Sequence, residues 1–230
     1  MATTTSVEPT FEPTTSSAPV LPARRGSALP ALALSIGAIG LGVLNLLSPW
    51  ASSTDQIATL RGDEALLTWL SVLWFCSSAL LVGGIAGVVG RVQGRGRRLA
   101  LIGGALAGAA SISSAAIGAL EGVGPALAGA IGDDEALAVA MQAFDTSPVL
   151  WVIFPIWLLG SVIGWPLLFG GAARAGLISA WLVVPVALAW VGNVVPTTSL
   201  VVTALLVCAF VVPAIVLAWR LVSPSTDAVR

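Results

Sequence analysis

Three consecutive acidic residues are the first candidates for chemistry in this sequence. Asp133, Asp134 and Glu135 stand together in the segment GDDEALAVAMQAF, and clustered carboxylates are the ligands that Ca²⁺ prefers. Consecutive residues of a helix point in different directions, however, and the ligand spacing of a calcium-binding loop is missing. The pattern instead favours a short amphipathic helix, with Asp133 or Asp134 capping its N-terminus. The apolar face of that helix would carry Leu137, Met141 and Phe144.

Hydrolytic chemistry lacks its usual base, because the 230-residue chain contains no His. Without His the Ser-His-Asp arrangement cannot be built, and the side chain that most often serves as general base or metal ligand is missing. We therefore expect no enzyme activity, no catalytic residue, no cofactor and no metal site. The weakest hypothesis left open is an enzyme acting on lipid, with Asp133, Asp134 and Glu135 as its acids.

Polar side chains inside the apolar runs offer a second kind of chemistry, the binding of a neutral solute. Ionisable residues within a membrane normally mark proton relays and ion paths, and the interiors of these runs contain none. Ser and Asn side chains there either bridge helices through hydrogen bonds or contact a neutral substrate, and the sequence leaves both roles open. The residues concerned are Asn45, Ser77, Ser78, Ser111, Ser113, Ser114, Asn193 and Thr203.

The segment RVQGRGRR, residues 91–98, gathers four of the ten arginines. Its glycines do not have the spacing of a phosphate-binding loop. Basic residues beside a membrane interact with anionic lipid headgroups, so orientation and lipid contact explain the cluster. The formal net charge of −1 implies no nucleic-acid partner for the chain as a whole.

The composition indicates the elements that must position these residues. Hydrophobic residues make up 57% of the chain and charged residues 9%, and the mean hydropathy is +0.99. Soluble domains contain about 25% charged residues, so the composition indicates an integral, multi-pass membrane protein. A helix needs about 20 apolar residues to cross a bilayer. We predict an all-α fold, a bundle of six transmembrane helices at residues 30–47, 65–89, 99–120, 149–169, 175–195 and 200–219.

The segments outside these spans are polar. Residues 1–27 are rich in Thr, Ser and Pro and have no apolar periodicity, which predicts a disordered tail. The six-helix domain would occupy residues 28–221, with an outer loop at 121–147, and residues 222–230 would form a second tail.

The arginines predict the orientation in the membrane. Nine of the ten fall in segments on the same side as the N-terminus, and Arg61 alone falls on the other side. Cytoplasmic loops carry such an excess of basic residues. We therefore predict that both termini are cytoplasmic and that the protein lies in a bacterial inner membrane, with the lipid bilayer as its immediate partner.

Small residues and prolines predict how the helices pack. Small residues let membrane helices approach closely, so a tight antiparallel hairpin of the second and third spans is expected, and replacing Gly83 or Gly108 with Leu should disrupt it. Prolines inside the last three spans should kink them. The small residues are Cys76, Ala79, Gly83, Ala86 and Gly90 in the second span and Gly104, Gly108, Ser111, Ala115 and Gly118 in the third; the prolines are Pro155, Pro166, Pro185 and Pro213.

The order of these parts resembles the six-span integral membrane proteins of bacteria that are grouped as domains of unknown function. The resemblance covers about residues 28–220 and lies in the stretches RGRRLALIGGALAG, FDTSPVLW and LLFGGAARAGLISAW. That family has no agreed activity, so the resemblance implies a six-span fold and no catalytic residue.

Two functions remain. The leading hypothesis is a non-enzymatic structural or accessory subunit, which implies a membrane-protein partner or a homo-oligomer. The alternative is a small carrier for a neutral or apolar solute, with a cavity between the kinked fourth to sixth spans near Trp157 and Asn193.

Overall fold

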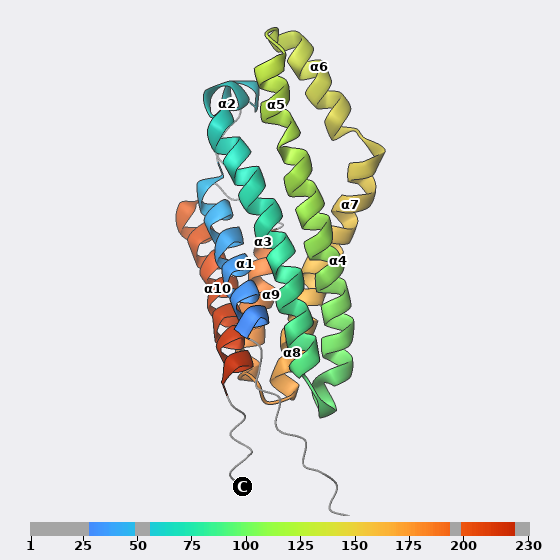
Figure 1. The fold of residues 1–230 in the computed structure, drawn as a ribbon, viewed down its shortest axis with the longest axis vertical. Coiled ribbons are helices and arrows are strands. Elements are labelled where there is room, and N and C mark those ends of the chain that lie inside the picture. The colour runs from blue at the N-terminus through green and yellow to red at the C-terminus, as the bar shows by residue number, and fades with distance from the viewer. Residues whose placement is uncertain (1–27, 49–55, 194–198, 224–230) are drawn as a thin grey trace, which may run out of the picture.

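The computed structural model describes residues 28–48, 56–193 and 199–223 of the chain. These residues form an elongated bundle of helices without a β-strand (Figure 1), which confirms the all-α prediction. The predicted tail at 1–27 lies outside the described residues, as do all but the first residues of the tail predicted at 222–230.

Five helical stretches of the described chain are long and apolar enough to cross a membrane. Two of them are composite: η2 (Gly94–Gly96), α4 (Arg97–Glu121) and α5 (Val123–Ala130) follow one another, and so do α7 (Pro148–Leu159), η3 (Gly160–Gly164) and α8 (Trp165–Arg174). The five stretches are α1 (Ala28–Leu47), α3 (Glu64–Arg91), Gly94–Ala130, Pro148–Arg174 and α10 (Leu200–Val222).

The remaining predicted span, at 175–195, corresponds to a shorter helix. It contains η4 (Ala180–Leu182) and α9 (Val183–Gly192), 3 and 10 residues long, which at about 1.5 Å per residue falls short of a hydrocarbon core of about 30 Å. The residues before it form a turn, in which Gly176 has a φ of +77° and Leu177 N donates to the carbonyl of Ala172. This helix-ending motif consists of apolar residues that the sequence pattern had assigned to the span. The predicted end of the span, at 194–195, lies outside the described residues.

Charged residues separate to the two ends of the bundle. One end holds the turn between α3 and α4, the C-terminal end of α8 and the C-terminal end of α10 (Figure 1). The other end holds α2 (Gln56–Gly62), α5 and α6 (Asp134–Asp145). Six described arginines lie at the first end: Arg91, Arg95, Arg97, Arg98, Arg174 and Arg220. The seven described acidic residues lie at the second: Asp63, Glu64, Glu121, Asp133, Asp134, Glu135 and Asp145.

The predicted outer loop, 121–147, is largely helical. Asp133 caps α6 by accepting a hydrogen bond from Ala136 N at 3.2 Å, as the sequence predicted for one of two residues. Leu137 and Met141 on its apolar face are buried with Leu60 of α2 and Leu67 of α3. A small second core therefore ties α6 to the end of the bundle.

The predicted hairpin of α3 and α4 is present, but its predicted small-residue seam is wrong on α3. Gly83 and the other four small residues singled out on that helix are exposed, and a Cβ atom on Gly108 of α4 would meet nothing within 4 Å. Large side chains of α3 pack against glycines of α4 instead. A Cβ atom on Gly118 would lie 2.8 Å from Cγ of Trp74.

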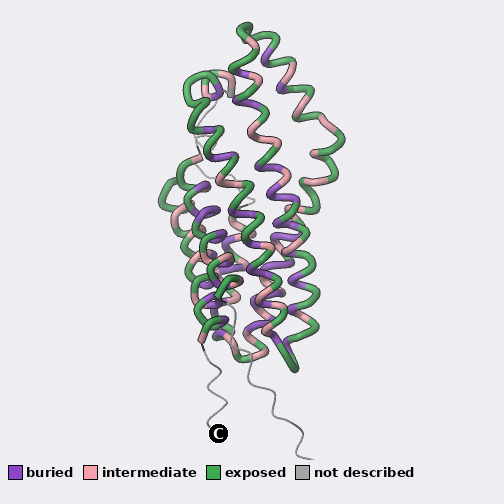
Figure 2. Tube along the Cα trace, viewed as in Figure 1, coloured by how far each residue is buried: buried purple, intermediate pink, exposed green. Residues whose placement is uncertain are grey.

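Glycines pack two other helix pairs closely. Between α1 and α3, a Cβ atom on Gly84 would lie 2.7 Å from Cα of Leu34. Between α4 and the α7–α8 stretch, a Cβ atom on Gly160 would lie 2.6 Å from the carbonyl oxygen of Leu106. These approaches leave the core dense in the half of the bundle that contains α8, where buried residues concentrate (Figure 2).

The stretch Pro148–Arg174 changes its winding in the middle. Pro155 lies inside α7, and η3 is a turn of π-helix, which matches the expected departure from regular helix near the prolines. No residue of α7 is buried, and Figure 2 shows exposed and intermediate positions along it. The α7 helix is thus the least enclosed wall of the bundle.

Candidate functional site

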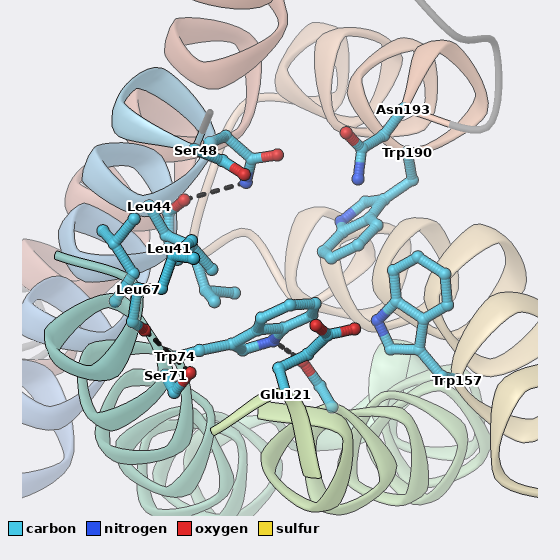
Figure 3. A pocket seen from close by; sticks show the side chains of 13 residues that line it. Leu41, Leu44, Ser48, Leu67, Ser71, Trp74, Glu121, Trp157, Trp190 and Asn193 are labelled. Carbon is cyan, nitrogen blue, oxygen red and sulfur yellow. Dashed lines mark hydrogen bonds between the residues drawn. The ribbon is translucent and has the colours of Figure 1, made fainter. Parts of the chain in front are cut away.

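A cavity of about 170 Å³ lies between α1, α3, α4, α7 and α9, toward the end of the bundle that carries the acidic residues (Figure 3). Its wall combines three indole rings, one carboxylate, two amides and several Ser and Leu side chains. The lining residues are Leu41, Leu44, Asn45, Ser48, Leu67, Leu70, Ser71, Trp74, Ser114, Glu121, Trp157, Trp190 and Asn193.

Trp74 is fixed on the α3 wall by a hydrogen bond and by close packing. Its Nε1 donates to Oγ of Ser114 on α4 at 2.8 Å, and Ser78 Oγ donates to the same oxygen at 2.9 Å. Gly118, one helical turn further along α4, leaves room for the ring. The position of this indole therefore depends on two residues of α4 that lack bulk.

Trp190 forms the α9 wall and is fixed by an aromatic cluster behind it. Its ring stacks on Trp165 with centroids 6.2 Å apart and planes 4° apart, and it meets the edge of Phe210 at 5.3 Å. Its Nε1 atom is buried and has no hydrogen-bond partner in the described structure. A buried unpaired donor costs free energy, so the ring is held by stacking and not by a hydrogen bond of its N–H group.

Trp157 supplies the third indole, from α7. Its ring lies 5.1 Å from that of Phe154 and is half-buried. Figure 3 shows the rings of Trp74, Trp157 and Trp190 arranged around the same space. Three separate helices therefore contribute one aromatic wall each.

Glu121 is the charged residue of the cavity. It is the last residue of α4, half-buried, and its carboxylate projects among the three indoles in Figure 3. Within the described part of the chain, no hydrogen bond or ion pair engages this carboxylate. A second carboxylate, Asp145 of α6, acts on it electrostatically, and no described arginine pairs with it.

The sequence placed some of these residues correctly and missed others. Asn193 and Trp157, singled out for a carrier, both line the cavity, and α7 and α9 belong to the predicted fourth and fifth spans. The other walls come from α1, α3 and α4, and the predicted sixth span contributes no lining residue. Glu121 was assigned to the outer loop, yet it stands seven residues after Ser114. Seven residues are about two helical turns, so Ser114 and Glu121 lie on the same face of α4. This spacing is the sequence signal that could have identified Glu121.

Only some of the polar residues predicted within the spans take one of the two roles left open, bridging helices or lining a binding site. Asn45, Ser114 and Asn193 line the cavity. Ser111 donates to the carbonyl of Ala107 in its own helix, and Ser78 bridges α3 to α4. Ser77 is buried where α3 meets α1, beside Gly40, Ser113 is buried on α4, and Thr203 donates to the carbonyl of Ser199.

A narrow void of about 10 Å³ continues from the cavity toward the middle of the bundle. Its polar lining comes from Ser78, Ser111, Ser114 and Ser161, and a space of this size is about that of a single water. Beyond it, Leu34, Leu81, Phe169 and Leu217 are almost completely buried. The polar lining thus ends at a dense apolar core.

The acidic cluster that opened the sequence analysis serves the structure of α6. Asp133 caps the helix, and Asp134 pairs with Arg61 of α2 at 2.9 Å, while Glu135 is exposed. Among the described residues, no group of three or more His, Cys, Asp or Glu side chains is arranged to hold a metal ion.

Comparison of the chain with protein-family models, with curated proteins and with solved structures found no match. The function is therefore inferred from the geometry of the cavity.

Proposed function

We propose that this protein is a carrier for a small organic solute, which it binds in the cavity between α1, α3, α4, α7 and α9. The observation that carries the proposal is the wall itself, in which three indole rings stand around the Glu121 carboxylate and the Asn193 amide, and in which Trp190 Nε1 has no partner among the described residues. Ligand sites are typically apolar and aromatic hollows with a few polar groups that set orientation. A purely structural helix bundle gains nothing from leaving such groups unpaired.

The position of the cavity along the bundle supports a carrier more than a static subunit. The cavity lies near the ends of α1, α4 and α9, whereas the opposite half is filled by the dense core that includes Trp165 and Phe169. A carrier binds its substrate near the middle of the membrane and exposes the site to one side at a time. In this proposal the solute enters the cavity from the acidic end.

The interrupted helical stretch Pro148–Arg174, beside the cavity, provides a point about which α7 can move. Trp157 lies between Pro155 and the π-helical turn η3, and α7 has no buried residue. Transporter sites are commonly built on interrupted helices, and π-turns frequently occur at functional sites. Rotation of α7 about η3 would change the aromatic wall without disturbing the glycine contacts between α8 and α4.

The distribution of charge supports the predicted orientation. The arginine-rich end would face the cytoplasm of a bacterial cell and the acidic end would face outward. In that orientation the cavity receives its solute from outside the inner membrane.

Native mass spectrometry of the full chain, extracted gently from its own membrane, tests the proposal. We expect a bound small molecule on the wild type, and loss of that molecule in Ser71→Leu, because the larger side chain enters the cavity. The matched control is Thr68→Leu, an exposed position one turn away on α3, which should keep the molecule.

A stoichiometric protein partner with no small molecule would contradict the carrier. That result would favour the accessory subunit, and the identity of the partner would then define the role.

A further inference from the structure

We propose that the solute is a small organic cation that also carries a hydrogen-bond acceptor, an amino alcohol with a quaternary or protonated nitrogen. The inference rests on the proposed function and names its substrate class. It places the cationic nitrogen beside Glu121, among the rings of Trp74, Trp157 and Trp190 (Figure 3).

The charge of the cavity selects for a cation. Glu121 has no ion-pair partner among the described residues, and Asp145 adds a second negative charge nearby. The arginine of this end, Arg61, is engaged elsewhere, with Asp134 and with the carbonyl of Ala128 at 2.5 Å. The two carboxylates would repel an anion, whereas a cation would supply the opposite charge that the half-buried carboxylate lacks.

The aromatic walls favour an alkylated cation over a metal ion. Indole is the best of the aromatic side chains for attracting a cation to its face, and cages of such rings recognise quaternary ammonium groups. A hard cation would instead need several oxygen ligands, and the cavity offers one carboxylate. Trp rings also bind the methyl groups of an alkylated nitrogen by ordinary apolar contact.

Hydrogen-bond donors without a partner are the reason to expect an acceptor oxygen on the ligand. Trp190 Nε1 is buried without a partner, and the Asn193 amide lies beside it in Figure 3. Trp190 is on α9 and Asn193 directly follows that helix, across the cavity from α3 and α4. A hydroxyl or carbonyl oxygen on the ligand would accept from these groups while the nitrogen stays near Glu121.

The volume limits the size of the ligand. The cavity measures about 170 Å³, and an engineered cavity of about 150 Å³ in another protein holds benzene. Choline has a comparable size, while a long acyl chain or a nucleotide is too large.

Calorimetric titration of the full chain in lipid nanodiscs tests the inference with two probes of one shape. The first is choline, and the second is its neutral isostere, in which a carbon atom replaces the ammonium nitrogen. We expect the wild type to bind choline at least about tenfold more tightly than the isostere, because only the charged probe gains from Glu121 and the ring faces.

Glu121→Gln keeps the shape of the side chain and removes its charge. We expect this variant to lose most of the preference for choline while its affinity for the isostere stays unchanged. The matched control is Glu135→Gln, an exposed acid on α6 at the same end, which should keep the full preference.

Two results would overturn the inference. Equal affinities of the wild type for the two probes would exclude recognition of charge, whether or not the variant folds, and binding of neither probe would exclude this ligand class. The proposed function would still be decided separately, by the presence or absence of a bound molecule in native mass spectrometry.

Discussion

Two residues of α4 determine the position of the Trp74 ring in the cavity wall. Gly118 and Ser114 both face Trp74 of α3, the first by lacking a side chain and the second by accepting its N–H group. A methyl group added at Gly118, or the loss of the hydroxyl oxygen of Ser114, should therefore change the cavity by displacing the Trp74 ring.

Gly118→Ala should destabilise the protein by about 1–3 kcal/mol, the usual cost of overpacking a fixed site. The added methyl would lie 2.8 Å from Cγ of Trp74 and 3.0 Å from the backbone nitrogen of Phe75. Reversible unfolding by titration with a denaturing detergent measures the change. The matched control is Gly108→Ala, where the methyl meets nothing within 4 Å; equal losses at both positions would contradict the described packing.

Ser114→Ala should cost about 1–3 kcal/mol, because it leaves the N–H group of Trp74 and the hydroxyl of Ser78 without their acceptor. The same unfolding titration applies. Ser111→Ala is the control, since Ser111 is also buried but bonds only within its own helix. A Ser111 variant as unstable as the Ser114 variant would show that the bridge between helices contributes nothing.

The site was predictable from sequence only where residue type was unusual. Trp157 and Asn193 stand out in an apolar run, so the sequence could nominate them. Glu121 does not, because it directly follows a predicted span and reads as loop. The sequence also could not show whether Gly83 faces another helix, because Ala and Gly occur on every face of α3. Only the packing of Gly84 against α1 shows which face is buried.

Helices at the acidic end are held together by fewer contacts than those in the core. Arg61 of α2 reaches Asp134 of α6 and the carbonyl of Ala128 of α5, and a small apolar cluster lies beneath. This arrangement fixes α6 over the end of the bundle, near the carboxylate of Glu121.

Arg61→Gln should loosen α6 with little effect on overall stability. The ion pair is partly exposed, with side-chain exposures of 32% and 71%, and such pairs contribute about 0–1 kcal/mol. Hydrogen exchange should become faster in residues 134–145 and stay unchanged in α1. Arg98→Gln, an exposed arginine at the opposite end, is the control, and unchanged exchange in α6 would contradict the role given to Arg61.

Element boundaries show what hydropathy can and cannot supply. Apolar runs predicted the five long helical stretches, because burying an unpaired backbone in lipid is too costly for anything but a helix or a closed barrel. They overestimated the span at 175–195, because the turn after α8 is made of apolar residues and hydropathy does not register the positive φ of Gly176.

For the whole molecule, the separation of charged residues to the two ends of the bundle is the feature that relates the fold to its orientation in a membrane. Six described arginines lie at one end and the described acids, with Arg61, lie at the other. This follows from the alternation of short loops along the sequence, and the helices bring each set together. The sequence therefore predicted the polarity of the bundle, although the cavity within it depends on the packing of five helices and could not be read from any one of them.

Labelling of single cysteines tests the orientation. In a chain whose own Cys76 and Cys208 are replaced by Ala, Glu135→Cys should react with a membrane-impermeant maleimide in bacterial cells with a permeabilised outer membrane. Arg95→Cys should react only after the inner membrane is opened. The reverse pattern would show that the arginine-rich end faces outward.

Solute uptake into proteoliposomes tests the carrier most directly. With choline and its neutral isostere as alternative labelled solutes, the wild type and Thr68→Leu should take up at least one of them faster than protein-free vesicles, with saturation. Ser71→Leu should fall to the level of passive leak, because its side chain fills the cavity. Uptake equal to leak for the wild type with both solutes, or undiminished uptake in Ser71→Leu, would contradict a carrier that works through this cavity.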